Sequence, residues 1–241
     1  MHYNSQPTNI DIISLKMKLK IVEPKYYPII GSLCFALIVC LIIIAINAID
    51  SRSSYYFYLP YNIFLAFISP ILGLLLSDRL RNTPWLKTSN ILLTLLTLLF
   101  LPNSFYMITD LIHVQQVIGI DVLYNIIFTN LAMFIGLVAG FISLYIIHTE
   151  LLKRMYYKYA HLIIGLLIIV ISFAIYLGRY LRWNSWDIVI NPAGLLFDAS
   201  DTLIHPSTHP SFFPIMVAFI LTIGSMYIVI WQFIKYFRRN T

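Results

Sequence analysis

Six long stretches of the chain contain no Asp, Glu, Lys or Arg, and they restrict the possible folds more than any other feature. They are residues 26–49, 53–77, 88–109, 122–147, 159–178 and 211–234. Each is near or above the ~20 residues that a helix needs to cross ~30 Å of hydrocarbon. Because lipid offers the backbone no hydrogen-bond partner, these stretches are expected to be helical. Only 11% of the residues are charged, far below the roughly 25% of a soluble domain.

The predicted fold is all-α, a polytopic membrane protein formed by a bundle of six transmembrane helices. The expected spans are about 27–49, 56–77, 90–110, 121–147, 160–179 and 212–234, within a single transmembrane domain over residues 26–235. Residues 1–25 and 236–241 are then tails on the same side of the membrane, because the number of spans is even.

The basic residues are divided unequally between the two sides of the predicted membrane. Thirteen of the 16 Lys and Arg residues lie before residue 26, in 78–88, in 148–158 or after residue 234, and three lie in the alternate connections. Cytoplasmic loops carry such an excess, so both termini are predicted to be cytoplasmic. Topology and attraction to anionic lipid head groups then account for the net charge of +6. The expected partner is the lipid bilayer, and no nucleic-acid partner is expected.

The longest connection, residues 179–211, is assigned to the outside of the membrane. Within it, Asn191 is a candidate N-cap and Pro192 stands at the first helical position. The following apolar residues and the two aspartates fall on different faces. The pattern predicts a short amphipathic helix lying on the outer surface, which ends before the His205–Pro206 pair.

A cluster of polar residues stands at the outer end of the third span, in the segment LPNSFYMITDLIH, residues 101–113. If the helix stays regular, Asn103, Tyr106, Asp110 and His113 share a sector of roughly 80°. Asp110 lies about 30 Å along the axis from Asn90. The cluster is therefore expected at the outer hydrocarbon boundary.

The fifth span ends in a polar segment at the same expected depth. Arg179 lies about 27 Å from a helix start near His161. It is followed at or beyond the interface by Arg182, Trp183, Asn184, Ser185, Trp186 and Asp187. These residues and the third-span cluster are predicted to line an outward-facing polar pocket. The predicted ligand-binding residues are Asn103, Tyr106, Asp110, His113, Arg179, Arg182, Trp183, Asn184, Trp186 and Asp187.

Small residues on two other spans predict close helix contacts. In the fourth span they are Asn125, Thr129, Ala132, Gly136, Gly140 and Ser143, and in the second Asn62, Ala66, Ser69 and Gly73. Small side chains in one stripe let helix backbones approach each other in lipid. Both stripes are therefore expected to face the interior of the bundle.

The segments LPNSFYMITDLIH and GRYLRWNSWD (178–187) together resemble an uncharacterised family of prokaryotic multi-pass integral membrane proteins, known only as a domain of unknown function. The resemblance covers roughly the second to the fifth span. It implies a multi-pass protein of a prokaryotic cell membrane in which both segments are important. It brings no established activity, substrate or catalytic residue.

Each polar constellation has a structural and a functional interpretation. Asp110 and Arg179 form either a structural ion pair or part of a ligand site. Arg179 and Arg182, beside two tryptophans, form either a phosphate clamp or an interfacial anchor. Glu150 and Asp78 are interpreted as solvated loop charges.

The catalytic residues, if there are any, are unknown. Asp110 and His113 are the candidates for an acid–base pair, which His205 and His209 from the outer loop could join. No metal site is predicted, because Pro206 interrupts a helical spacing of the loop histidines and no Cys or Glu partner is available. No cofactor is expected, since the chain has no phosphate-binding glycine loop.

Three functions remain open at this stage. The first is a protein whose outward pocket binds or processes an anionic lipid or a lipid-linked envelope precursor. The second is a small transporter or channel subunit, which would require oligomerisation. The third is a structural or assembly partner of another membrane protein, or of further copies of this chain.

Overall fold

A computed structural model describes residues 27–51, 58–116 and 122–240, and these residues contain helices and turns but no strand. The membrane-length elements are α2 (Tyr27–Ser51), α3 (Tyr58–Arg79), α4 (Thr88–Tyr106) with the 3₁₀ helix η3 (Met107–Gln116), α5 (Val122–Leu152), α6 (Tyr157–Tyr180) and α9 (Phe212–Asn240). Shorter elements join α6 to α9. They are α7 (Asp187–Ile190), α8 (Pro192–Ile204) and η4 (Pro206–Thr208). The all-α prediction is thus confirmed for the described part of the chain. Residues 1–25, predicted as a tail, lie outside it.

Within those described ranges, five helices are long and apolar enough to cross a membrane. They are Leu59–Arg79, Thr88–Ile112, Ile126–Leu152, Tyr157–Tyr180 and Phe212–Arg238. The first predicted span corresponds to α2, whose described apolar part is the shorter segment Gly31–Ile46. The chain is therefore a multi-pass membrane protein with at least these five candidate spans.

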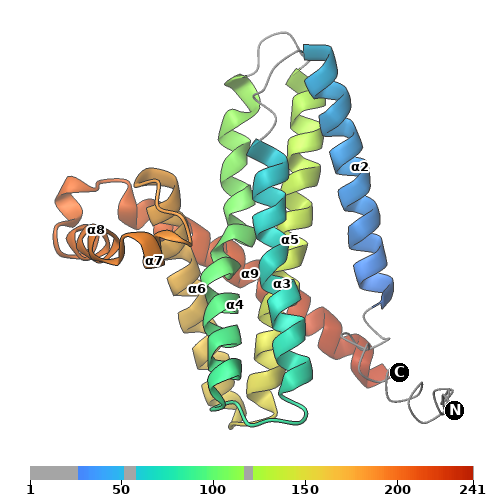
Figure 1. Cartoon of the computed structure of the whole chain (residues 1–241), viewed down its shortest axis with the longest axis vertical. Helices are drawn as coiled ribbons and strands as arrows, with labels where there is room; N and C mark the ends of the chain where they lie inside the picture. The colour runs from blue at the N-terminus through green and yellow to red at the C-terminus, as the bar shows by residue number, and fades with distance from the viewer. Residues whose placement is uncertain (1–26, 52–57, 117–121, 241) are drawn as a thin grey trace, which may run out of the picture.

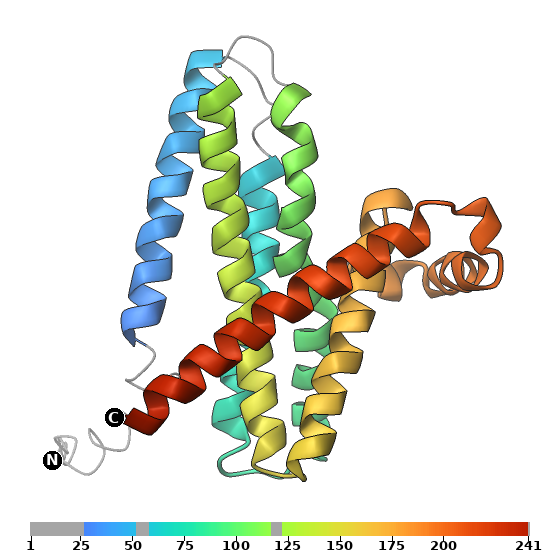
Figure 2. The same ribbon diagram turned by 180° about the vertical axis from the view of Figure 1, so that it is seen from behind.

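The helix α5 forms the centre of the bundle. Of its most apolar stretch, 67% is buried inside the molecule, against 11% for α9. Figure 1 shows α3, α4 and α5 running side by side, with α2 beside α5. Figure 2 shows α9 crossing the bundle obliquely. The bundle thus has a packed core of four helices, α3 to α6, and a long helix on its surface.

The predicted inward stripe of α5 is confirmed. Thr129, Ala132 and Ser143 are buried, and a Cβ on Gly140 would stand 2.7 Å from the ring of Phe105 in α4. A Cβ on Gly136 would stand 2.9 Å from a backbone oxygen of α4. Glycine is therefore required at both positions for the two helices to approach this closely. The side chain of Asn125, also in the predicted stripe, lies outside the described residues.

The stripe of α3 packs on α4 through hydrogen bonds that its small residues permit. Ser104 donates to the carbonyl oxygen of Ala66 at 2.7 Å, and Ser69 donates to the carbonyl oxygen of Thr97 at 3.1 Å. All four residues are fully buried. Hydroxyls bonded to backbone carbonyls satisfy polar groups at a depth where lipid offers none.

The third span does not remain a regular α-helix. It passes over Pro102 and changes at Met107 into η3. A 3₁₀ helix turns ~120° per residue instead of ~100°. Asp110 therefore lies about 80° farther round from Tyr106 than a regular helix would place it. The predicted sector assumed a regular helix, and this condition is not met beyond Tyr106. Asp110 contacts both Asn62 in α3 and Arg179 in α6, and Tyr106 also contacts Arg179.

The connection between α6 and α9 contains the helix expected there. The side chain of Asn191 accepts a hydrogen bond from the amide of Gly194 at 3.1 Å, so Asn191 caps α8 as predicted, and Pro192 occupies its first turn. The helix ends at Ile204, before the His205–Pro206 pair. In Figures 1 and 2, α8 is seen end-on, so its axis runs across the bundle axis.

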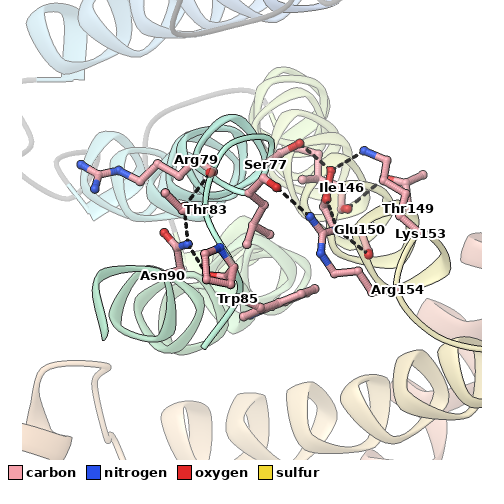
Figure 3. A network of polar contacts seen from close by, with 12 residues as sticks. Ser77, Arg79, Thr83, Trp85, Asn90, Ile146, Thr149, Glu150, Lys153 and Arg154 are labelled. Carbon is pink, nitrogen blue, oxygen red and sulfur yellow. Dashed lines mark hydrogen bonds and ion pairs between the residues drawn. The ribbon is translucent and has the colours of Figure 1, made fainter. Parts of the chain in front are cut away.

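A buried carboxylate fastens the opposite end of the bundle (Figure 3). Glu150 is only 2% exposed and accepts hydrogen bonds from Ser77 in α3 at 2.8 Å, from Lys153 at 2.6 Å and from Arg154. Arg154 also donates to the carbonyl oxygen of Leu80 at 3.0 Å. The interpretation of Glu150 as a solvated loop charge is wrong, because α3 covers it and three donors satisfy it.

Candidate functional site

A cavity of about 840 Å³ lies between α3, α4, α6 and the α7–α8 segment. We call it the outer cavity, after the side of the membrane on which the sequence predicts its residues to lie. Its polar or aromatic lining comprises Tyr61, Asn62, Asn103, Tyr106, Asp110, Phe173, Arg179, Trp183, Asn184 and Ser185. Most of the remaining lining is aliphatic, from α3, α4, α6 and α8. The structure thus brings the two predicted polar segments to one space.

Arg179, in the last turn of α6, is held against the outer part of the third span. Its guanidinium donates to the hydroxyl of Tyr106 at 3.3 Å and to the carbonyl oxygen of Thr109 at 3.1 Å. It also lies over the ring of Tyr106, 5.8 Å from the centroid. One guanidinium nitrogen is 4.0 Å from a carboxylate oxygen of Asp110. These contacts hold the cation at the wall of the cavity with 18% of its side chain exposed.

Asp110 is 1% exposed, and its second carboxylate oxygen accepts a hydrogen bond from Asn62 in α3 at 2.9 Å. Asn62 was expected to face inward but was not among the predicted site residues. A polar side chain at the outer end of the α3 small-residue stripe was the signal that could have identified it. The arrangement links α3, η3 and α6 through one amide, one carboxylate and one guanidinium.

Asn103 positions the segment that follows α6. Its side-chain amide donates to the hydroxyl of Ser185 at 2.8 Å, and that hydroxyl donates to the carbonyl oxygen of Leu99 at 2.9 Å. Gly178 permits the close approach of the two helices, since a Cβ there would stand 3.3 Å from the ring of Tyr106. Ser185 therefore contributes to this wall although it was not predicted as a ligand residue.

Three predicted ligand residues do not line the outer cavity. Arg182 is exposed and has a positive φ of 61° at the turn after α6. Asp187 accepts a hydrogen bond from the backbone amide of Asn184 at 2.6 Å, which fixes the turn into α7. Trp186 packs edge-on against Tyr61 with ring centroids 6.2 Å apart. Their contacts assign Asp187 and Trp186 to the structure of the loop rather than to the cavity.

Trp183 and His113 were also predicted as ligand-binding residues. Trp183 lines the cavity and donates its indole N–H to Asp198 at 2.9 Å, which ties the turn to α8. His113 belongs to η3, but its side chain lies outside the described residues. Its proposed pairing with Asp110 therefore stays a prediction.

The loop histidines lie with Asp201, not with Asp110. His205 contacts one carboxylate oxygen of Asp201 at 2.8 Å, and His209 contacts the other at 3.4 Å. These two hydrogen bonds, first that of His205, lower the pKa of Asp201 below its ordinary value. Over residues 27–51, 58–116 and 122–240, no group of three His, Cys, Asp or Glu side chains is arranged to hold a metal ion. The described contacts of these histidines thus do not support the option that they join Asp110.

The outer cavity combines one cation, one carboxylate and several hydrogen-bonding groups with a larger apolar surface. An arginine side chain can bind a planar or tetrahedral oxyanion through several donors at once. The aliphatic and aromatic lining excludes water from the other part of the space. Such a site can orient a molecule that is anionic at one end and apolar at the other.

Comparisons with known proteins give one informative result. No curated protein and no solved structure matches the chain. A family model described as a protein of unknown function (DUF1361) matches residues 61–228, which include most of α3, all of α4 to α8 and more than half of α9. The matched region contains both polar segments and every described wall of the outer cavity. The chain therefore belongs to the DUF1361 family of proteins of unknown function.

Proposed function

We propose that the chain is a six-span protein of a prokaryotic cell membrane whose outer cavity binds an anionic amphiphile, such as a lipid phosphate or a lipid-linked envelope precursor. The observation that carries the proposal is the position of Arg179 on the wall of a largely apolar space of about 840 Å³. Arg179 binds the anionic group, and the apolar lining accommodates part of the lipid chain.

The neighbours of Arg179 support this assignment. Tyr106 and the carbonyl oxygen of Thr109 are neutral, so they fix the direction of the guanidinium without cancelling its charge. Asp110 lowers the net charge of the site, and Asn62 holds its carboxylate from the opposite side. The carboxylate of Asp110 repels a phosphodiester with a single negative charge less than a phosphomonoester with two, so the site suits the phosphodiester better.

The helix α8 supports the assignment of the cavity to the outer interface. Leu196, Phe197, Leu203 and Ile204 are each more than half exposed, while Asp198 and Asp201 make the polar contacts described above. A helix that runs across the bundle axis with such side chains suits an amphipathic helix embedded in the head-group region. In this topology both termini are cytoplasmic, as the positive-inside pattern predicts.

A second candidate function, assembly with another membrane protein or with further copies of this chain, is favoured by α9. Its spanning segment is only 11% buried, so it offers a long apolar surface to lipid or to a partner helix. The transporter alternative lacks comparable support. Three polar side chains that a transport path through α3 and α4 could use, those of Ser69, Thr97 and Ser104, are instead fully buried in the contact between these helices.

The chain offers a matched pair of arginines to test the first proposal. Arg179 lines the outer cavity, whereas Arg182, three residues later, does not. We would release wild-type, Arg179→Gln and Arg182→Gln proteins from native membranes and measure retained ligands by native mass spectrometry. A charge-assisted contact contributes about 1.5–3 kcal/mol, so Arg179→Gln is expected to lower retention of an anionic adduct about tenfold or more. Arg182→Gln is expected to retain it.

Two other outcomes would contradict the binding proposal. Equal loss of the adduct from both variants would show that the bound molecule only follows surface charge. Absence of any adduct from wild type, with Arg179→Gln less stable than Arg182→Gln, would assign Arg179 to the packing of α4 against α6. Co-purification of a partner protein that is lost in Arg179→Gln would favour the assembly function instead.

A further inference from the structure

A second cavity, of about 730 Å³, lies between α6 and α9 and shares no lining residue with the outer cavity. We call it the α6–α9 groove. At the beginning of α9, Phe212 packs edge-on against Phe173 and Tyr176 of α6, with centroid distances of 5.7 and 5.0 Å. From this crossing α9 runs away from α6 toward its C-terminus (Figure 2). The groove therefore occupies the angle between two diverging helices.

Two glycines keep the α6–α9 groove open. Gly165 in α6 and Gly224 in α9 both line it, and a Cβ at either position would meet nothing within 4 Å. These glycines differ from Gly136 and Gly140 of α5, which are in close contact with α4. The remaining lining of α6 and α9 is mainly aliphatic, from Leu162 to Ile228. In a bilayer, an apolar groove of this kind is a place for a hydrocarbon chain.

One end of the groove is polar and carries positive charge. Lys235, Gln232 and His161 line this end and are exposed. The described lining contains no Asp or Glu. The same end of the bundle carries Lys153 and Arg154, which are bonded to Glu150. A ligand with a negative head group and an apolar tail therefore matches the groove in charge and in polarity.

His148, on α5, adds a specific polar feature beside this end. It is 1% exposed and stacks on Trp231, with centroids 4.0 Å apart. Its Nδ1 is 2.9 Å from the hydroxyl of Tyr227, whereas that hydroxyl is 3.4 Å from the carbonyl oxygen of Leu144. The hydroxyl of Tyr227 donates to that carbonyl oxygen, and the donor in its contact with Nδ1 depends on the tautomer of His148. The other ring nitrogen, Nε2, is a donor in one tautomer and an acceptor in the other. Among the described residues this Nε2 has no hydrogen-bond partner.

We propose that the α6–α9 groove binds one anionic glycerophospholipid from the leaflet at the basic ends of the helices. An acyl chain lies between Gly165 and Gly224, the phosphate lies at Lys235, and a polar group of the lipid supplies the hydrogen-bond partner that Nε2 of His148 lacks. This site is separate from the outer cavity and does not depend on the function proposed for it.

The test uses the full chain in detergent with added phosphatidylglycerol or phosphatidylcholine of the same acyl chains, followed by native mass spectrometry. Arg179→Gln is measured beside wild type, so that a lipid in the outer cavity is distinguished from one in the groove. One lysine beside a lipid head group corresponds to about a fivefold preference for the anionic lipid. Both proteins are expected to show this preference.

Three further variants separate the apolar and the charged parts of the groove. Gly224→Leu places an apolar side chain in the groove at a position where the Cβ meets nothing within 4 Å, and it is expected to lower lipid retention about tenfold. Lys235→Gln is expected to remove the preference for phosphatidylglycerol but to leave binding of both lipids. Gly31→Leu on α2, where a Cβ also meets nothing within 4 Å, is the control and is expected to behave as wild type.

Several results would overturn the proposal. Unchanged retention in Gly224→Leu, or no preference for phosphatidylglycerol in wild type, would show that the groove has no specific lipid. A dimer that Gly224→Leu converts to monomer, with lipid retention unchanged, would identify a second copy of the chain as the occupant. Equal loss of lipid from Gly31→Leu and Gly224→Leu would show only general lipid contact.

Discussion

The contact between α4 and α5 makes a strong prediction about two glycines. In Gly136→Ala, the new methyl group would stand 2.9 Å from both the Cβ of Met107 and the carbonyl oxygen of Ser104, and even closer to the Cγ of Met107. In Gly140→Ala, it would stand 2.7 Å from the ring of Phe105. The carbonyl oxygen of Ser104 is a backbone atom, and the Cβ of Met107 is bonded directly to the backbone. Phe105 is fully buried. Neither helix can therefore accommodate the methyl group without moving.

The size of the effect follows from two opposing contributions. Alanine in place of glycine within a helix gains about 0.5–1 kcal/mol, and this gain applies wherever the methyl group has room. Forcing an extra methyl group into a packed interior costs about 1–3 kcal/mol. Gly31→Ala and Gly165→Ala provide the matched controls, since a Cβ at either position meets nothing within 4 Å. Gly136→Ala and Gly140→Ala are expected to be about 1–3 kcal/mol less stable than these controls.

The assay is equilibrium unfolding in mixed micelles, with increasing fractions of a denaturing detergent and tryptophan fluorescence as the signal. Helix content is measured in parallel by circular dichroism to confirm that each variant starts from the same fold. If Gly136→Ala is as stable as Gly31→Ala, then α4 and α5 do not approach as closely as described, and the argument from helix contact is refuted.

Three other predictions concern separate parts of the molecule. Glu150→Ala is expected to lower the free energy of unfolding by about 1–3 kcal/mol, because the hydrogen bonds of Ser77 and Arg154 to this buried carboxylate are lost. Lys153→Ala, at a side chain that is 62% exposed, is expected to change the free energy of unfolding by less than about 1 kcal/mol. Equal effects of the two substitutions in the same unfolding assay would show that the Glu150 carboxylate does not stabilise this end of the bundle. Arg182→Gly is expected to stabilise the protein by about 1 kcal/mol relative to Arg182→Ala, because a φ of 61° is unfavourable for any residue with a Cβ; no difference between the two thermal midpoints would contradict this. The hydrogen bond from His205 is the largest cause of the lowered pKa of Asp201. The stabilisation from this contact is therefore fully present above the ordinary pKa of an aspartate, and it is lost as the pH falls through the lowered pKa of Asp201. In a carboxyl ¹³C titration, the midpoint of Asp201 is expected to rise in His205→Ala, and an unchanged midpoint would exclude the hydrogen bond as the cause.

Much of the fold could be predicted because the membrane imposes simple rules on a sequence. Long uncharged stretches must be helical in hydrocarbon, and the helices found over α3 to α6 and in α9 follow these stretches. The stripe around Gly136 could be assigned to a helix contact because small residues at helical spacing have few other uses in lipid. The cap at Asn191 could be predicted because side-chain oxygens before Pro satisfy free amides at a helix start.

The site was harder to predict because its geometry depends on the relative rotation of the helices. The sequence predicts the depths of Asp110 and Arg179, and the structure places their side chains 4.0 Å apart. It does not reveal that Asp110 bonds to Asn62, because this contact requires the turn from α-helix to 3₁₀ helix after Tyr106.

The burial of Glu150 was missed for a related reason. Charges beside basic residues at the end of a span are usually solvated, and only the packing of α3 against α5 brings Ser77 over this carboxylate. A contact between residues 73 positions apart leaves no pattern in a local sequence window. The same applies to the bond between Trp183 and Asp198, which ties α8 to the turn after α6.

The 3₁₀ helix η3 also determines where the native state exchanges most readily with solvent. Its hydrogen bonds have poorer geometry than those of an α-helix, and runs longer than three or four residues are uncommon, whereas η3 has 10 residues. Backbone amides of Met107–Gln116 should therefore exchange with deuterium earlier than those of the buried α5. Asp110 belongs to this segment, so we expect this wall of the outer cavity to exchange before the core of the bundle does. Occupation of the cavity would then be recorded as slower deuterium uptake along η3, before the chemical identity of the occupant is known.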